Sequence, residues 1–131
     1  MKFFRLFILT ILASVISFVS LSQDNVVDNV RAALKAGSSR ELIKYFNDVV
    51  ELKIDGENSN YSRTQAEFIL KEFFRKNEAQ GFEYVFEGNS REGLKYAIGT
   101  YTHKEGSYRV YILFKKADSS LVIDTLDFTK E

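Results

Sequence analysis

Few side chains of this chain could carry out chemistry. It has no Cys, which excludes a thiol nucleophile, a disulfide and a lipid-modified Cys. Its single His, His103, leaves no second His to complete a pair of metal ligands. A nucleophilic dyad would need His103 beside a Ser or an Asp, and no spacing in the sequence places one there. His103 is therefore expected to be a surface or stacking residue near a hairpin end.

Asp124 is the acid whose setting suggests proton transfer. It lies between Val122 and Leu126 on one face of a predicted strand. A carboxylate on an apolar strand face could act as a general base. The competing interpretation is that this face is exposed to solvent, or that Asp124 protects a sheet edge from aggregation. We favour this second interpretation, because charges are a common device at sheet edges.

Other motifs fall short of the patterns that a metal or a phosphate requires. The segment 55–60, DGENSN, alternates oxygen ligands but lacks the sixth-position glycine and the late Glu of a calcium loop. A turn is expected there. Asn60-Tyr61-Ser62 matches a glycosylation sequon, but Ser62 is already explained as a helix cap. The glycines match no phosphate loop, so we expect neither a metal nor a cofactor.

Residues 1–22 have the three-part pattern of a secretory signal peptide. Lys2 and Arg5 precede an apolar run over 6–19, and small residues stand before a cleavage point near Ser22-Gln23. These fourteen residues would rise only ~21 Å as a helix, short of the ~30 Å hydrocarbon core. We expect cleavage, a periplasmic or secreted location, and no membrane attachment after cleavage.

The mature chain, 23–131, is expected to be a single domain. Cleavage would remove two cations and no acid, so the net charge would move from 0 to −2. This balance argues against a nucleic-acid-binding protein. A chain of this size buries ~60 to ~68% of its unfolded surface, enough for one core without cross-links.

Hydrophobic periodicity and capping signals predict helices first and strands later. The predicted helices cover 26–36, 39–46 and 63–77, and the predicted strands cover 49–54, 82–87, 95–103, 107–116 and 121–128. The order is therefore α-α-β-α-β-β-β-β. It indicates an α+β domain with three helices on one face of a curled, cone-like antiparallel sheet of four to five strands.

A hairpin around Glu105-Gly106 allows the two sheet faces to be assigned. If these two residues form the loop, the pairs on one face are His103 with Tyr108, Tyr101 with Val110, Gly99 with Ile112 and Ala97 with Phe114. Small residues opposite large ones are typical of a surface on which another element packs. We therefore place the helices on this face. The aromatic pair Phe73-Phe74 is expected to fill the concavity, and mid-strand Gly99 suggests a bulge or a bend.

Two groups of residues on this hairpin are candidate binding sites. On the covered face, Tyr101, His103 and Tyr108 could line the mouth of a cone and bind a small apolar ligand, although a place in the core is the favoured interpretation. On the opposite face, large apolar side chains are expected to form an exposed patch, which usually marks an interface. The interface residues are Tyr96, Ile98, Tyr111 and Leu113. We expect a homodimer or a protein partner there.

The sequence also carries a resemblance. Helices that lead into a curled sheet are similar to the cone of the nuclear transport factor 2-like, or cystatin-like, superfamily. Over essentially the whole mature chain, the sequence resembles the secreted bacterial domain-of-unknown-function family numbered 4783. The segments that carry the resemblance are Tyr61-Ser62-Arg63-Thr64-Gln65-Ala66-Glu67, Lys71-Glu72-Phe73-Phe74, Lys95-Tyr96-Ala97-Ile98-Gly99-Thr100 and Tyr108-Arg109-Val110-Tyr111. The last strand departs from the family pattern, with Asp124, Asp127 and Phe128 in place of a basic-apolar strand.

This resemblance implies a fold and a location but no activity. It implies dimerisation through the outer sheet face, since superfamily members often associate that way. Isomerases of the superfamily use a carboxylate within the cone. Two functions therefore stay open: a non-catalytic module that binds a small apolar ligand or a protein partner, which we favour, and a cone-pocket isomerase or hydrolase that uses Asp124 with Tyr or His donors.

Overall fold

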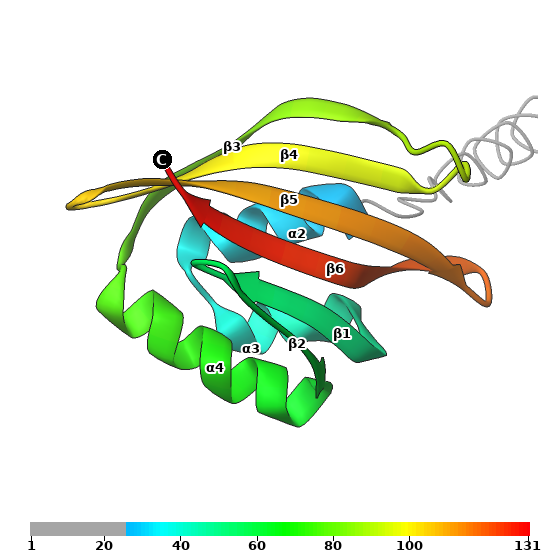
Figure 1. Cartoon of the computed structure of the whole chain (residues 1–131), viewed down its shortest axis with the longest axis horizontal. Helices are drawn as coiled ribbons and strands as arrows, with labels where there is room; N and C mark the ends of the chain where they lie inside the picture. The colour runs from blue at the N-terminus through cyan, green and yellow to red at the C-terminus, as the bar shows by residue number, and fades with distance from the viewer. Residues whose placement is uncertain (1–25) are drawn as a thin grey trace, which may run out of the picture.

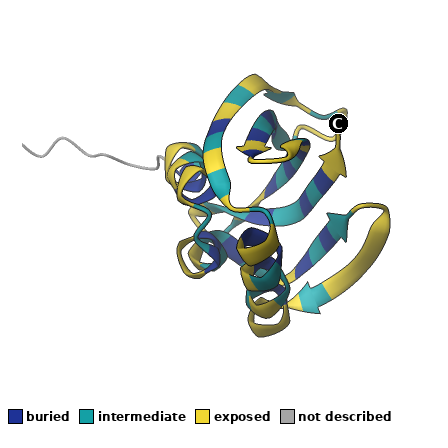
Figure 2. Cartoon of the chain, turned by 90° about the vertical axis from the view of Figure 1, so that its left-hand side faces the viewer, coloured by how far each residue is buried: buried dark blue, intermediate teal, exposed yellow. Residues whose placement is uncertain are grey.

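The computed structural model describes residues 26–131, so the predicted signal peptide lies outside the described residues. They form a strongly curled six-stranded sheet with helices on its concave side (Figures 1 and 2). The elements are α2 (Val26–Ala36), α3 (Ser39–Leu42), the 3-10 helix η1 (Ile43–Tyr45), β1 (Phe46–Ile54), β2 (Glu57–Ser62), α4 (Arg63–Lys76), β3 (Ala79–Asn89), β4 (Lys95–His103), β5 (Gly106–Ala117) and β6 (Ser120–Lys130). None of the helices within residues 26–131 is long and apolar enough to cross a membrane.

Local signals determine the helix boundaries. Gly37 ends α2 with a φ of +63°, a backbone conformation that favours glycine. The hydroxyl of Ser38 accepts a 3.1 Å hydrogen bond from the Glu41 amide and so caps α3. The predicted second helix is too long, because it changes to η1 after Leu42 and Phe46 already belongs to β1. Phe46 is fully buried against β6, so tertiary packing overrides the helical pattern there.

The prediction of four to five strands is wrong, because β2 makes a sixth. It pairs antiparallel with β1 through the Asp55-Gly56 turn, and five of its six residues are exposed. Its sequence, ENSNYS, has no apolar alternation, so periodicity does not mark it as a strand. Backbone hydrogen bonds to β1 create this edge strand instead of side-chain burial.

The prediction of a purely antiparallel sheet is also wrong. The strand order is β2-β1-β6-β5-β4-β3, and the β1–β6 pair is parallel while the other neighbours are antiparallel. The last strand lies between β5 and β1, where Phe46 pairs with Ile123 and Ile54 pairs with Phe128. No local sequence pattern reports this pairing, because its partners are more than 70 residues apart.

The face assignment of the β4–β5 hairpin holds, although its register differs. His103 pairs with Gly106, so the two-residue turn is Lys104-Glu105 and not Glu105-Gly106. Each partner is shifted by two residues, so that Tyr101 faces Tyr108. Side chains alternate between faces with a period of two, so a two-residue shift leaves every side chain on the same face. The helices cover the face that was predicted, and the buried bands lie on the inside of the curl (Figure 2).

Helix α4 closes the concave side as expected. Ser62 and Gln65 form a complete capping box, and the helix starts at Arg63. The Phe73 ring contacts those of Phe128 at 4.5 Å and Tyr108 at 5.1 Å between centroids. The interior of the cone is therefore filled by aromatic rings, which confirms the role predicted for the Phe73-Phe74 pair.

Candidate functional site

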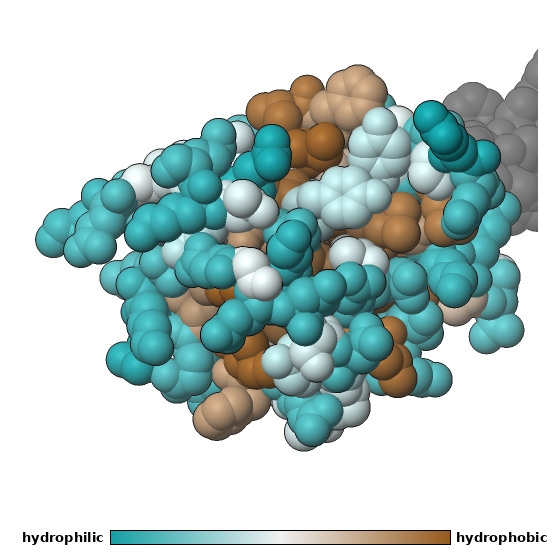
Figure 3. Space-filling view, in the orientation of Figure 1, coloured by the Kyte–Doolittle hydropathy of each residue, from teal (hydrophilic) through white to brown (hydrophobic). Residues whose placement is uncertain are grey.

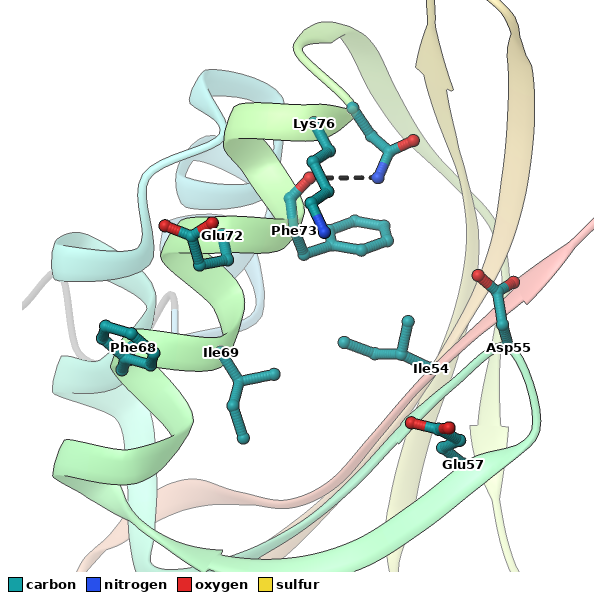
Figure 4. A pocket seen from close by; sticks show the side chains of 9 residues that line it. Ile54, Asp55, Glu57, Phe68, Ile69, Glu72, Phe73 and Lys76 are labelled. Atoms are coloured by element: carbon teal, nitrogen blue, oxygen red, sulfur yellow. Dashed lines mark hydrogen bonds between the residues drawn. The ribbon is translucent and has the colours of Figure 1, made fainter.

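An open cavity of about 510 Å³ lies between α4 and the turn that joins β1 to β2 (Figure 4). We call it the α4 groove. Its lining residues are Ile54, Asp55, Glu57, Phe68, Ile69, Glu72, Phe73, Lys76 and Asn77. Apolar side chains form its walls, and charged side chains surround its opening. None of the lining residues was a predicted site residue.

Helical spacing places the α4 residues of the groove on one face. Phe68, Glu72 and Lys76 follow one another at intervals of four residues, as do Ile69 and Phe73 in the adjacent row. Phe73 is buried and forms the inner wall, whereas Phe68 is 68% exposed. A large exposed aromatic side chain beside a cavity is the signal that could have directed attention to this face.

The other side of the groove is built by a tight turn. Asp55 and Gly56 have φ values of +50° and +88°, so both central residues adopt the conformation of a type I′ hairpin turn. Ile54 and Glu57 are paired across this turn. Figure 4 shows Ile54, Asp55 and Glu57 opposite Ile69 and Phe73, with open space between the two sets, and Phe68 on the outer side of α4.

The groove continues along α4 beyond Phe68. A second cavity of about 440 Å³ is lined by Tyr61, Thr64, Gln65, Phe68 and Ile69. It shares Phe68 and Ile69 with the α4 groove, so the two hollows meet at these side chains. The surface beside α4 is thus hollowed on both sides of Phe68 and Ile69.

The charged groups of the groove are unevenly paired. Glu72 accepts a 2.9 Å hydrogen bond from Arg75, and this bond, together with the charge of the guanidinium, lowers the pKa of Glu72. Within residues 26–131, Asp55, Glu57 and Lys76 form no salt bridge. The turn therefore carries two carboxylates without a salt bridge at the edge of the groove, and that of Asp55 has the Tyr108 hydroxyl as a neighbour.

The structure brings the candidate ligand residues Tyr101, His103 and Tyr108 together, but in the core. The His103 ring lies 6.5 Å from that of Tyr101 and 5.4 Å from that of Tyr108. All three side chains are buried, and none of them lines the α4 groove. These three residues therefore lie in the core, behind the Phe73 ring, as the favoured interpretation had it.

Hydrogen bonding in this cluster is incomplete. The Tyr101 hydroxyl donates to the carbonyl oxygen of Asn77, and burial raises the pKa of Tyr101 to about 12. Nδ1 of His103 accepts from the Glu105 amide at 3.4 Å, whereas its buried Nε2 has no partner among the described residues. Burial, followed by the neighbouring Asp55 carboxylate, raises the pKa of Tyr108.

Asp124 lies in a different part of the molecule. It falls at the irregularity where β5 and β6 change register, and it accepts a 3.4 Å hydrogen bond from the side-chain amide of Asn47. The interpretation that Asp124 protects a sheet edge is wrong, because β6 lies between β1 and β5. Lys130, which pairs with Tyr108, is six residues further along β6, roughly 20 Å at ~3.3 Å per residue. The structure therefore does not bring Asp124 together with the Tyr and His donors of the isomerase hypothesis.

The four predicted interface residues do lie together, on the outer face of the sheet. Tyr96, Ile98, Tyr111 and Leu113 are all partly exposed, and the Tyr96 and Tyr111 rings are 5.8 Å apart. Phe86, which is 53% exposed, extends the row with its ring 5.8 Å from Tyr96. We call these five residues the outer sheet patch. Figure 3 shows apolar and aromatic side chains gathered over β3 to β5 on this face.

Sequence periodicity did not find Phe86 as part of this patch. The alternation of Phe82, Tyr84 and Phe86 predicts one shared face, but the pairing of β3 with β4 shifts between Tyr84 and Phe86. Tyr84 is opposite Gly99 on the inner face, whereas Phe86 is opposite Ile98 on the outer face. This bulge was signalled only by Gly99, where the Phe82 ring occupies the space of a side chain.

Comparisons with known structures place the fold first. An NTF-2-like protein of unknown function from Burkholderia xenovorans LB400 has a TM-score of 0.58 over 80% of each chain, at 14% identity. The curled sheet and its covering helices therefore define a nuclear transport factor 2-like fold. No curated protein matches this chain.

The family follows from closer matches. The family model "Domain of unknown function (DUF4783)" matches residues 27–129, and the chain belongs to this family. A DUF4783 protein from Bacteroides ovatus ATCC 8483 is 34% identical, with a TM-score of 0.74 over 79% of this chain and 93% of the other. A DUF4783 protein from Bacteroides uniformis ATCC 8492 is 30% identical, with a TM-score of 0.76 over 82% of this chain and 98% of the other.

Proposed function

We propose that this protein is an exported, non-catalytic binding module that takes an apolar ligand in the α4 groove. The observation that carries the proposal is the groove itself, a cavity of about 510 Å³ walled by Ile54, Ile69 and Phe73. Ligand sites commonly measure ~300–1,000 Å³ and are mostly apolar with a few polar groups at the edge. The groove has this size and this distribution of side chains.

The setting of the groove favours binding over catalysis. Its walls belong to a capped helix and a tight hairpin, which hold them in place. The only His and the buried Tyr101 and Tyr108 side chains are packed in the core and do not line the groove. Phe68, by contrast, is exposed beside it and would lose water contact when an apolar ligand enters.

Titration with decanol, followed by NMR of the isoleucine methyl groups, tests this proposal. We expect the Ile54 and Ile69 methyl signals to shift in a saturable way at concentrations where decanol does not aggregate. Phe68→Ala should weaken binding by about fivefold, since it removes apolar contact area. Val49→Ala is the matched control, because Val49 is also an exposed apolar residue, and it does not line the groove.

Two results would overturn the proposal. If neither the Ile54 nor the Ile69 signals respond to decanol, the groove does not take apolar chains. If Phe68→Ala and Val49→Ala weaken binding equally, the decanol is bound by general surface hydrophobicity and not in the groove.

We also propose that the outer sheet patch holds two copies of the protein together or docks on a protein partner. The patch combines Tyr and Phe side chains with an exposed polar margin, including Arg109, Thr102 and Lys115. Aromatic residues are enriched in interface centres, and polar residues form the rim. Gly88 leaves room for two side chains of the patch, because a Cβ at this position would lie 3.0 Å from both the Phe86 ring and the Tyr96 hydroxyl.

A further inference from the structure

We infer that the ligand of the α4 groove is a small amphiphile with a positively charged head. This inference rests on the proposed function of the same groove and adds the chemical class of its ligand. It follows from two features: acidic side chains outnumber basic ones around the opening, and these charged side chains are separate from the apolar side chains that form the walls.

Acids outnumber cations at the opening. Asp55, Glu57 and Glu72 line the groove, against one cation, Lys76. Arg75 engages Glu72 at 2.9 Å, which leaves the two carboxylates of the turn without an ion-pair partner among residues 26–131. The Asp55 carboxylate neighbours the Tyr108 hydroxyl, but neither carboxylate has a cation beside it, and a ligand that brings a cation to this edge would supply that ion pair.

The carboxylates and the apolar walls occupy different positions. Asp55 and Glu57 flank Gly56 at the hairpin turn, and both side chains are exposed. In Figure 4 they lie on the side of the groove away from Phe68 and Ile69, and Ile54 extends between them and α4. An alkyl chain between Ile54 and Ile69 therefore places its end group beside the turn. The two positive φ values, at Asp55 and Gly56, restrict the backbone of the turn, so the two acidic residues start from a defined position at the opening.

This arrangement discriminates between head groups. An ammonium group would be attracted by the Asp55 and Glu57 carboxylates and repelled by Lys76 alone, whereas a carboxylate would meet two like charges and one opposite charge. A hydroxyl head group would experience neither effect. Because the groups are exposed, the discrimination should be moderate and should weaken as salt screens the charges.

Three ligands of equal chain length test the inference: decylamine, decanol and decanoate, each below its aggregation concentration at pH 7 and 20 mM salt. The readout is the dissociation constant from the shifts of the Ile54 and Ile69 methyl signals. We expect decylamine to bind about tenfold more tightly than decanol, and decanoate to bind most weakly. At 500 mM salt the preference for decylamine over decanol should fall to about twofold.

A pair of matched variants locates the effect. Asp55→Asn combined with Glu57→Gln should bring the affinity for decylamine close to that for decanol. Asp118→Asn combined with Glu92→Gln removes the same number of acids elsewhere and should retain the preference. Asp118 is a suitable match for Asp55, because the two residues have φ values of +56° and +50° in hairpin turns and Asn tolerates this conformation.

The outcomes separate the two proposals. If decanol binds the groove but decanoate binds as tightly as decylamine, the cationic ligand is wrong and the apolar groove stands. The cationic ligand is also wrong, and the apolar groove stands, if the preference for decylamine survives in the Asp55→Asn/Glu57→Gln variant but is lost in the Asp118→Asn/Glu92→Gln control. If none of the three ligands shifts the Ile54 and Ile69 signals, the groove is not a ligand site and both proposals fall.

Discussion

Phe73 joins α4 to the sheet, with aromatic rings from β5 and β6 in contact with it. Phe73→Ala should therefore lower the free energy of unfolding by about 3–5 kcal/mol, the range for a large core aromatic side chain. Arg75→Ala should leave it nearly unchanged, since Arg75 is exposed and its ion pair with Glu72 is a surface pair. Urea unfolding of the two variants checks this; equal effects would mean that the wrong face of α4 was assigned to the core.

Tyr101 couples stability to alkaline pH. Burial raises its pKa to about 12 in the folded protein, above the ordinary value of 10.0. The folded state then retains a proton that the unfolded state loses, so stability from Tyr101 is complete below pH 10 and is lost as pH rises toward 12. Between these two pH values the free energy of unfolding can fall by about 1.4 kcal/mol per pH unit.

The variant Tyr101→Phe should be less stable at pH 7, because its bond to the Asn77 carbonyl is gone, yet should lose less stability between pH 10 and 12. Some alkaline sensitivity should remain, since burial also raises the pKa of Tyr84 and of Tyr108. Urea midpoints across this range provide the measurement. Parallel curves for the variant and the wild type would show that Tyr101 does not contribute to the pH dependence.

Among the elements, the β3–β4 pair depends on a missing side chain. A Cβ at Gly99 would lie 2.8 Å from the Glu83 carbonyl oxygen and would also collide with the Phe82 ring. Gly99→Ala should therefore destabilise the protein by about 1–3 kcal/mol through overpacking. Gly81→Ala is the control on the adjacent strand, because nothing lies within 4 Å of a Cβ there. Thermal unfolding should separate the two variants, and similar melting temperatures would contradict the close packing of β3 on β4.

At the scale of the whole molecule, the outer sheet patch predicts self-association. The mature protein should sediment as a dimer at micromolar concentration, and Leu113→Glu should make it monomeric while it stays folded, because the new charge would be buried in the contact. Ser119→Glu, in the exposed β5–β6 turn, adds the same charge outside the patch and should remain dimeric. A wild type that is monomeric and binds no partner would refute the patch as an interface. Unfolding of Leu113→Glu would instead show that Leu113 supports the core.

Export is the second prediction at this scale. Full-length protein with a C-terminal tag, produced in a bacterium, should appear outside the cytoplasm with an N-terminus at or near Gln23, because residues 1–22 have the pattern of a cleaved signal. N-terminal sequencing of the purified protein decides the matter. Recovery of protein that still begins with Met1 would exclude cleavage.

The sequence alone determined the features that depend on local chemistry. The capping box at Ser62 and the helical spacing that follows it predicted α4 from Arg63 to near Asn77, and the helix ends at Lys76. The two-residue period of β4 and β5 predicted which side chains share a face, and this held even though the turn is displaced by one residue. Both signals operate over a few residues, so they are readable without a partner.

The tertiary structure alone decided what depends on segments far apart in the chain. Strand β2 exists because its polar backbone pairs with β1, and β6 lies parallel to β1 across more than 70 residues of sequence. The β3 bulge turned Phe86 to the outer face. The α4 groove arises only where the turn after Ile54 meets the helix face at Phe68 and Ile69. Neither the turn nor the helix alone encloses a cavity. The shape and the charge balance of the groove depend on the distance between these two segments.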